Sequence, residues 1–449
     1  MQNKAILIPG VSNVDAIALK RAVWFYFFLI IFEGALRKWV VPGLATPLLV
    51  VRDPIALWLI YQLYNKGLLP SSIYLKGMAW LGVIGILTAM IFGHHNLIVA
   101  IFGARIYLIH FTLIFAIGKV FDRDDVLELG RILLWISIPM ALLIGVQFYS
   151  PQSAFVNIGV GGDESGGGFS GAMGYFRPPG TFSFTNGVHL FFGLVGCFVF
   201  YFLLAGKKEN KIMLIGASIG LLAAIPFSIS RSLTFTLAAV AVFVMFTALR
   251  KPENLLKMIF TIIGLVALVA VLSQMSVFAT AIEAFLARFS NAADSEGGLE
   301  GTLGDRYFGG MIASLLRSTR QPFFGYGIGM GTNVGSMLLT GGLTYLIDEG
   351  EWGRILGEMG AIMGLAMIYL RIGLSFQLLN LSYKKMVTGD ILPWVILGYT
   401  LTILPQGQWS QPTSLGFTVL SAGLVFASLR NRVLPREIPI DTNIKESQL

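Results

Sequence analysis

Charge is the scarcest property of this chain. Of its 449 residues only 12% are charged, whereas 55% are hydrophobic. A soluble domain carries about 25% charged residues and roughly 45–50% apolar ones. The composition therefore excludes an ordinary soluble domain and predicts a protein that places much of its surface in lipid.

Cysteine and histidine are also nearly absent. The single cysteine, Cys197, excludes an intrachain disulfide and a cysteine-rich metal site. The histidines form no HExxH motif, and the adjacent pair His94 and His95 has poor geometry for joint ligation. We therefore expect no metal and no cofactor. Nor does the net charge of +8 indicate nucleic acid, because the basic residues lie in short clusters between apolar runs.

Apolar runs recur from one end of the chain to the other. Because a helix needs about 20 residues to cross the hydrocarbon, these runs predict about twelve spans. All of them must be helices, since lipid cannot satisfy free backbone polar groups. The fold class is thus an all-α polytopic membrane protein. The predicted spans are 18–36, 44–65, 75–93, 97–118, 126–149, 184–206, 211–229, 232–250, 255–280, 352–380, 390–406 and 411–429.

The connections between the predicted spans differ in charge and in length. Most of the 32 lysines and arginines fall in one alternate set of connections together with both ends of the chain, which places both termini in the cytoplasm. On the outer side two connections are long, glycine-rich and charged: 150–182 and 281–351. We expect the second to cap a polar chamber and to carry short amphipathic helices, one from Gly304 to Ser318. Residues 431–449 are predicted to be a polar cytoplasmic tail.

Arg177 is the first candidate for binding a ligand. It opens the run Arg-Pro-Pro-Gly-Thr-Phe, whose prolines and glycine force a rigid, non-helical approach to the next span. A guanidinium fixed there is suited to gripping a phosphate or a sugar. The alternative is an arginine that extends toward lipid headgroups.

Arg231 and Arg105 are cations in or near the hydrocarbon. Arg231 lies in Ser-Ile-Ser-Arg-Ser between two spans with almost no loop, and charges so placed usually face a polar cavity. The alternative for Arg231 is an ordinary turn. Arg105 lies in mid-span, where an arginine costs roughly 2.5–3.5 kcal/mol. It therefore needs a partner, for which Glu33 and Asp53 are the candidates, and a structural ion pair competes with a ligand contact.

The long outer connection contains the remaining candidates. Arg306, at the start of the predicted amphipathic helix, is expected to point toward the chamber. The glycine-rich run from Pro322 to Gly331 lacks a preceding strand and a Gly-Lys-Ser/Thr signature, so a close-packed turn is expected rather than nucleotide binding. Glu351, Arg354 and Glu358 share one helix face. Glu351 and Glu358 are candidates for a general base, or are acidic residues favoured at a helix N-terminus.

The order of these motifs resembles the O-antigen polymerase and ligase superfamily. The motifs are the arginine–proline run before a span, Ser-x-Ser-Arg between two spans and Asp-Arg in the large outer loop. A Phe-Gly-x-Gly turn and the run Leu356 to Gly364 follow them. The early run Phe32 to Trp39 is also similar to bacterial polysaccharide polymerase-like proteins. The resemblance covers most of the chain up to Gly364.

The resemblance implies a helical protein of the bacterial cytoplasmic membrane with a large periplasmic loop over a cavity that faces lipid. The implied reaction transfers an oligosaccharide from a polyprenyl diphosphate to an acceptor sugar without a metal. Arg177, Arg231 and Arg306 would hold the diphosphate, because fixed cations stabilise the charge that the leaving group gains. Arg105 is a further candidate contact. The implied partners are the polyprenyl-diphosphate-linked oligosaccharide, the lipid bilayer and a polysaccharide chain-length regulator.

One departure from the family pattern bears on the reaction. Ligases of this superfamily carry a histidine ahead of the Leu-x-Glu motif, whereas this chain has Asp348, Glu349, Gly350 and Glu351 there and no histidine after His189. We therefore expect a polymerase whose catalytic residues are Glu351, Glu358 and Arg306. The alternatives are a ligase-type transferase, a transporter of lipid-linked oligosaccharide and a non-catalytic assembly subunit.

Overall fold

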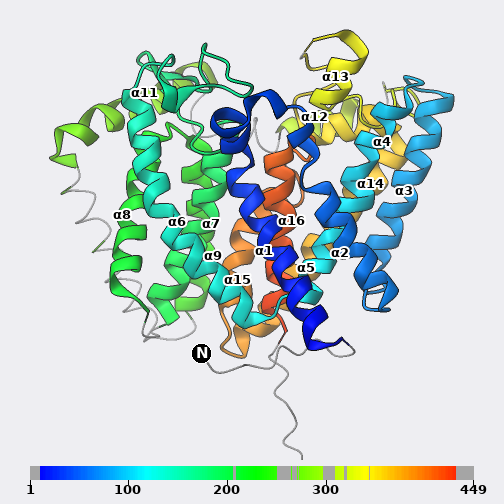
Figure 1. Ribbon diagram of the computed structural model, residues 1–449, viewed down its shortest axis with the longest axis horizontal. Coiled ribbons are helices and arrows are strands. Elements are labelled where there is room, and N and C mark those ends of the chain that lie inside the picture. The colour runs from blue at the N-terminus through cyan, green and yellow to red at the C-terminus, as the bar shows by residue number, and fades with distance from the viewer. Residues whose placement is uncertain are drawn as a thin grey trace, which may run out of the picture.

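The structure is a computed structural model, and it describes residues 11–205, 209–249, 264, 271, 273–296, 309–317, 321–342 and 344–430. In this part of the chain long helices stand side by side in a bundle (Figure 1). The helices are α1 Asn13–Ala35, α2 Asp53–Asn65, α3 Ile73–Ile91, α4 Leu97–Arg105, α5 Phe111–Val120, α6 Arg123–Tyr149, α7 Asn186–Ala205, α8 Lys211–Phe227, α9 Arg231–Ala248, α11 Ser276–Glu296, α12 Gly310–Arg317, α13 Asn333–Thr340, α14 Glu351–Val387, α15 Leu392–Ile403 and α16 Pro412–Ser428.

Shorter elements complete the described chain. A π-helical turn, Leu36–Val40, follows α1, and a second, Ile106–His110, joins α4 to α5. Three 3₁₀ turns occur at Pro42–Leu44, Pro47–Val50 and Phe155–Asn157. The strands β1 Phe169–Ala172 and β2 Tyr175–Arg177 pair as an antiparallel hairpin.

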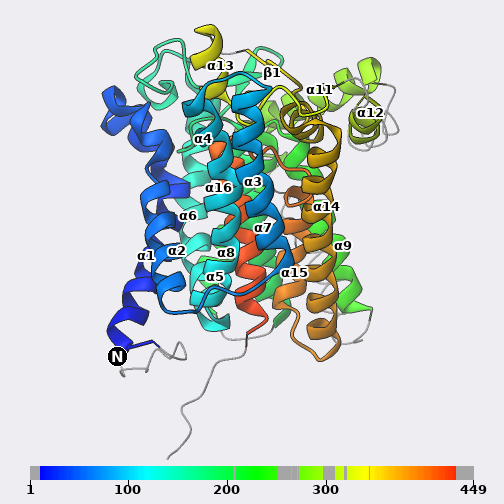
Figure 2. The ribbon, with the colours of Figure 1, turned by 90° about the vertical axis from the view of Figure 1, so that its right-hand side faces the viewer.

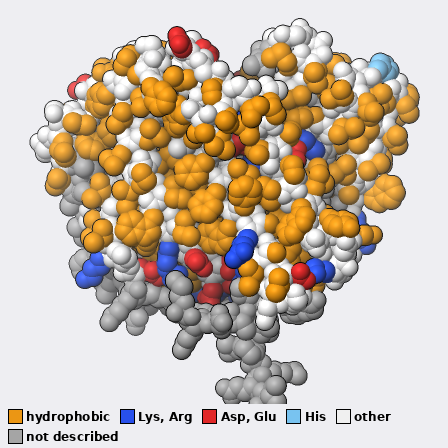
Figure 3. Space-filling view, in the orientation of Figure 1, with side chains coloured by type: hydrophobic (Ala, Val, Ile, Leu, Met, Phe, Trp, Pro, Cys, Tyr) orange, Lys and Arg blue, Asp and Glu red, His pale blue; other side chains and the backbone are white. Residues whose placement is uncertain are grey.

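Within the described residues, five helices are long and apolar enough to cross a membrane. One is the continuous helical run Leu97–Val120, which comprises α4 and α5, and the other four are α3, α6, α7 and α14. Four shorter apolar helices accompany them: α8, α9, α15 and α16. Hydrophobic side chains cover the middle of the molecular surface, while charged ones gather toward its lower rim (Figure 3). The chain is thus a helical membrane protein. The number of twelve spans stays a prediction, and the predicted tail 431–449 lies outside the described residues, as does most of the predicted span 255–280.

The bundle has two ends, which we name by what they carry. At the terminal face α1 begins and α5, α7, α14 and α16 end (Figures 1 and 2). At the opposite, loop face lie residues 150–182, α11, α12 and α13. The first part of the predicted outer loop is helical, because α11 continues to Glu296. Within the predicted amphipathic helix 304–318, the described part forms α12, whose Ile312 and Leu316 are exposed.

Two predicted spans differ from the helices observed. The span 44–65 becomes helical only at Asp53, because Pro47 supports a 3₁₀ turn and Pro54 is suited to the first turn of a new helix. The span 352–380 continues as α14 to Val387, with a break at Gly360, where φ is 73°. Only glycine adopts that conformation at little cost.

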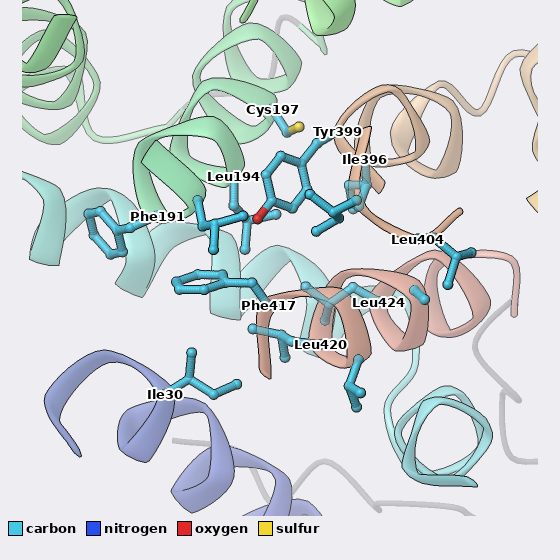
Figure 4. Close-up of a cluster of buried hydrophobic side chains, with 14 of the residues drawn as sticks. Ile30, Phe191, Leu194, Cys197, Ile396, Tyr399, Leu404, Phe417, Leu420 and Leu424 are labelled. Carbon is cyan, nitrogen blue, oxygen red and sulfur yellow. The ribbon is translucent and has the colours of Figure 1, made fainter. Parts of the chain in front are cut away.

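The core is centred on α7, which is buried along most of its length. In Figure 4, Cys197 of α7 lies next to Tyr399 of α15, and Phe191 of α7 and Phe417 of α16 belong to the same cluster of buried side chains. All four side chains are fully buried. A helix that is apolar on every side belongs inside a bundle. Because α7 begins near the loop face, its first residues lie in the middle of the molecule at that end.

Candidate functional site

The hairpin at the loop face fixes Arg177. In the antiparallel register Arg177 lies opposite Phe169, and its guanidinium lies 4.8 Å from the centre of that ring. The hairpin rests on the end of α6, because the ring of Tyr175 stacks on Phe148 with their centres 4.6 Å apart. Arg177 is half-buried. The predicted non-helical approach to the next span is confirmed, because Arg177 ends β2 ahead of α7. Its place at the outer membrane rim stays a prediction.

The same hairpin lies against the turn that precedes Arg231. A methyl group on Gly171 would lie 2.8 Å from Ile229 Cδ1 and 3.5 Å from Arg177 Cγ. Ile229 has a φ of 45°, and Ser230 caps α9 by accepting a hydrogen bond from Leu233 N. Two segments that are far apart in the sequence thus meet, and each presents a half-buried arginine.

An apolar cavity adjoins these two segments. It measures about 670 Å³ and is lined by α6, α8 and the start of α11. Tyr149 lines it, and the centre of this ring lies 6.5 Å from that of Tyr175 in the hairpin. The centres of the Phe278 and Phe227 rings lie 5.1 Å apart, so the start of α11 packs against the end of α8 beside the cavity. A cation-bearing hairpin therefore stands next to a space suited to a hydrocarbon chain.

The segment that follows Arg177 is clamped to the end of α1. Lys38 Nζ donates to Gly180 O at 2.6 Å, and Arg37 Nη1 donates to Ser183 Oγ at 2.9 Å. A methyl group on Gly34 would lie only 2.3 Å from Ser183 N, so the two backbones touch. Burial lowers the pKa of the Lys38 ammonium to about 7.

Arg37 begins a cluster of buried charges that continues into α2. Arg37 Nη1 lies 3.5 Å from Glu33 Oε1, and Arg52 Nε lies 3.1 Å from Glu33 Oε2. Arg52 also donates to Pro412 O at 2.6 Å. The three charged side chains are at most 8% exposed. Glu33 is therefore shared between two arginines.

Arg105 belongs to the continuation of this cluster. Its Nη1 donates to both oxygens of Asp53, at 2.9 and 2.8 Å, which confirms one of its two predicted partners. His110 Nε2 lies 2.9 Å from Asp53 Oδ1. Within the described part of the chain, Arg52 Nη1 and His110 Nδ1 are buried without a hydrogen-bond partner. Three arginines thus face two carboxylates, an arrangement that favours an additional anion.

The predicted acidic residues of α14 form a second, closed cluster. Arg354 Nη1 donates to Glu358 at 2.6 Å, while its Nε and Nη2 donate to Glu351 at 3.0 and 2.9 Å. Arg371 Nη1 donates to Glu351 at 2.6 Å, and Tyr107 Oη accepts from Arg354 at 3.1 Å. All four charged residues are at most 4% exposed. Two cations and two anions balance here, so this cluster is suited to supporting the fold.

The glycine-rich turn packs on this cluster. Gly331 N donates to Glu358 Oε1 at 2.9 Å, and Gly327 N donates to Glu358 O at 3.0 Å. A methyl group on Gly360 would lie 2.0 Å from Phe323 O. The expectation of a close-packed turn is confirmed, and the break in α14 is the place where the turn fits.

A row of amides runs from the start of α7 to the residues just before α14. Asn186 Nδ2 donates to Gln411 Oε1, and Gln411 Nε2 donates to Gln408 Oε1 at 2.7 Å. Gln408 in turn donates to Glu349 O at 2.8 Å. The outline of the molecule is hollowed between the side that carries residues 150–182 and the side that carries α13 (Figure 3). Sequence reasoning missed this row, although three glutamines within Gln406–Gln411 were its signal.

Three further predictions concern Arg306, a metal site and the single cysteine. Arg306 lies outside the described residues. Among the described residues, no group of three or more His, Cys, Asp and Glu side chains is placed to hold a metal ion. The lone thiol, Cys197, is buried in the core.

Comparison of the chain with protein-family models, with curated proteins and with solved structures gives no match. The class of this protein is therefore described from its fold and its site. It is a helical membrane protein with buried arginine clusters and an apolar cavity near one face.

Proposed function

We propose that this protein is a membrane glycosyltransferase of the O-antigen polymerase type. It would polymerise polyprenyl-diphosphate-linked repeat units at the periplasmic face of the bacterial cytoplasmic membrane. The observation that carries the proposal is the meeting of the Arg177 hairpin and the Arg231 turn beside an apolar cavity. The resemblance of the motif order to that superfamily supports it independently.

The donor's chemistry suits this arrangement. A polyprenyl diphosphate joins a long hydrocarbon chain to a charged head, and the cavity between α6 and α8 offers the apolar part of such a site. Arg177 and Arg231 would hold the diphosphate. As the glycosidic bond to phosphate breaks, the bonding electrons pass to the diphosphate, and fixed guanidinium groups stabilise that charge. Arg306 keeps its proposed place as a third cation.

The acceptor sugar would lie against the amide row. Asn186, Gln408 and Gln411 offer donors and acceptors in a fixed sequence, which matches the hydroxyl groups of a sugar. The row begins at Asn186, a few residues after Arg177 in the same clamped segment. Donor and acceptor would therefore meet near the start of α7.

A carboxylate of α14 would remove the acceptor's proton. Glu351 accepts hydrogen bonds from Arg354, Arg371 and Trp409 N, so it is engaged on every side. Glu358 is held by Arg354 and Gly331 N. In this arrangement either carboxylate would act as a base only after its network opens.

The proposal is tested with Arg177→Ala and Arg231→Ala in cells. Chain growth should be lost and single lipid-linked repeat units should accumulate on the outer leaflet, as seen by polysaccharide gels and analysis of extracted lipids. Loss of one fixed charge donor in an active site costs about 10²–10³ in rate. The control is Arg21→Ala, which removes an exposed arginine of α1 near the terminal face.

Three other outcomes would contradict the polymerase. A lipid-linked unit trapped on the inner leaflet indicates a transporter. Polymer of normal length that is not attached to its final acceptor indicates a ligase. Normal polymer in both variants indicates a non-catalytic assembly subunit.

A further inference from the structure

A second cavity lies at the terminal face, far from the candidate site. It measures about 830 Å³. Four elements surround it: the start of α3 with the preceding residues Pro70–Ser72, and the last turns of α5, α14 and α16. These helix ends lie together at the lower side of the bundle (Figure 2).

The lining of this cavity is positively charged. Lys119, Lys384, Lys385 and Arg430 contribute to it, and none of its lining residues in the described part of the chain is acidic. The N-terminus of α3 also faces it, with Ser72 Oγ accepting from Tyr74 N. A helix N-terminus carries a partial positive charge, so five features of one sign converge. Such a cavity favours an anion.

One of the four cations is rigidly placed. Arg430 Nη1 donates to the carbonyls of Gly118 and Phe121, at 3.2 and 3.1 Å, and to that of Lys119. It thereby binds the end of α16 to the end of α5. The site is therefore built into the helix packing at this point and is not a chance gathering of mobile lysines.

The rest of the lining is apolar. Ile73, Phe115, Leu381, Phe426 and Leu429 form it. The rings of Phe115 and Phe426 lie 5.4 Å apart and belong to α5 and α16, which pack closely. An occupant must therefore carry both a negative charge and a hydrocarbon portion.

We propose that this cavity binds one anionic phospholipid. Its phosphate would contact Lys119, Lys384 and Arg430, and its acyl chain would follow the apolar wall. Basic pockets between membrane helices at the cytoplasmic side recognise anionic headgroups in this way. The lipid would tie the end of α14 to α3, α5 and α16. The proposal does not depend on the glycosyltransferase activity.

The test uses the full chain, purified in a mild detergent. Native mass spectrometry should show one retained phosphatidylglycerol, and phosphatidylcholine with the same acyl chains should be retained far less. In Lys119→Gln/Lys384→Gln the apparent affinity for phosphatidylglycerol should fall about 25-fold, because each cation near an anionic headgroup contributes about fivefold. Lys119→Arg/Lys384→Arg should bind as the unaltered protein does.

The matched control is Lys211→Gln, which removes an exposed lysine at the same face outside this cavity and should leave binding unchanged. Equal retention of phosphatidylglycerol by the double glutamine variant would overturn the proposal. So would equal retention of phosphatidylcholine. Displacement of the lipid by millimolar inorganic phosphate would also overturn it, because the site would then bind a free anion and not a lipid.

Discussion

The buried charged residues of this protein differ in whether an opposite charge balances them. Among the residues that the structure describes, five arginines are buried: Arg37, Arg52, Arg105, Arg354 and Arg371. The two from α14 are balanced by Glu351 and Glu358, whereas the other three share Glu33 and Asp53. Removing one member of a closed pair leaves an uncompensated buried charge, which costs more than the pair itself contributes.

Glu351→Gln tests the closed cluster. The change keeps the shape but leaves Arg354 and Arg371 with too little negative charge, so the free energy of unfolding should fall by about 3–5 kcal/mol. Thermal unfolding in detergent measures the loss. The matched control is Glu349→Gln, two residues away and exposed. An unfolding temperature equal to that of the unaltered protein, with polymerisation lost, would show that Glu351 acts in the reaction and not in the fold.

At the scale of elements, close backbone contacts place the site. The π turn Leu36–Val40 after α1 directs Arg37 and Lys38 toward the segment 180–183, and Gly34 permits the approach. A second π turn, Ile106–His110, directly follows Arg105. Such turns are frequent at functional positions, because they re-aim side chains within a helix.

Gly34→Ala tests the contact between α1 and the segment after Arg177. Inside an exposed helix this change would stabilise by about 1 kcal/mol. Here the new methyl group meets backbone atoms at 2.3–2.5 Å, so we expect a net loss of about 3 kcal/mol or more in the free energy of unfolding. Gly43→Ala is the control, because nothing lies within 4 Å of its methyl position. Equal unfolding temperatures for the two variants would contradict the observed packing.

The whole molecule is a bundle whose two faces differ in chemistry. Charged loops, the hairpin and both arginine clusters occupy the half near the loop face, while the basic cavity lies at the terminal face. The distribution of basic residues in the sequence predicts that the terminal face is cytoplasmic.

Cysteine labelling tests this orientation. Because Cys197 is buried and is the chain's one cysteine, a single introduced cysteine should be the main site that the reagent labels. In intact cells a membrane-impermeant maleimide should label His95→Cys, which is exposed at the loop face. It should label Lys211→Cys only after the cells are opened. The unaltered protein serves as the blank, and the reverse pattern would invert the predicted topology.

Much of the fold could be predicted because membrane helices carry a local signal. Length and hydropathy locate α1, α3, α6, α7, α8 and α16 within a few residues, since each must be apolar over enough of its length to lie in lipid. The predicted start of α2 is wrong, because hydropathy does not register that Pro47 lies in a 3₁₀ turn and that Pro54 belongs to the first turn of the helix. In the site, the pairing of Arg105 with Asp53 was predicted as one of two options, from the cost of an unpaired charge.

Contacts between distant segments could not be predicted in this way. The spacing of Glu351, Arg354 and Glu358 shows one helix face, but not that Arg371 and Tyr107 complete their network. Equally, no local pattern shows that Gly171 of the hairpin touches Ile229, or that Asn186 reaches Gln411.

The sequence alone therefore determined the helical membrane class, the positions of several long apolar helices and the residues whose charge demands a partner. These follow from short-range rules: the thickness of lipid, the need to satisfy backbone groups and the cost of burying a charge. The tertiary structure decided which charges meet, which arginines are balanced and where the two cavities lie. These ion pairs and cavities depend on how helices far apart in the chain pack together. The packing is set by the shape complementarity of entire helix surfaces, which no short stretch of sequence contains.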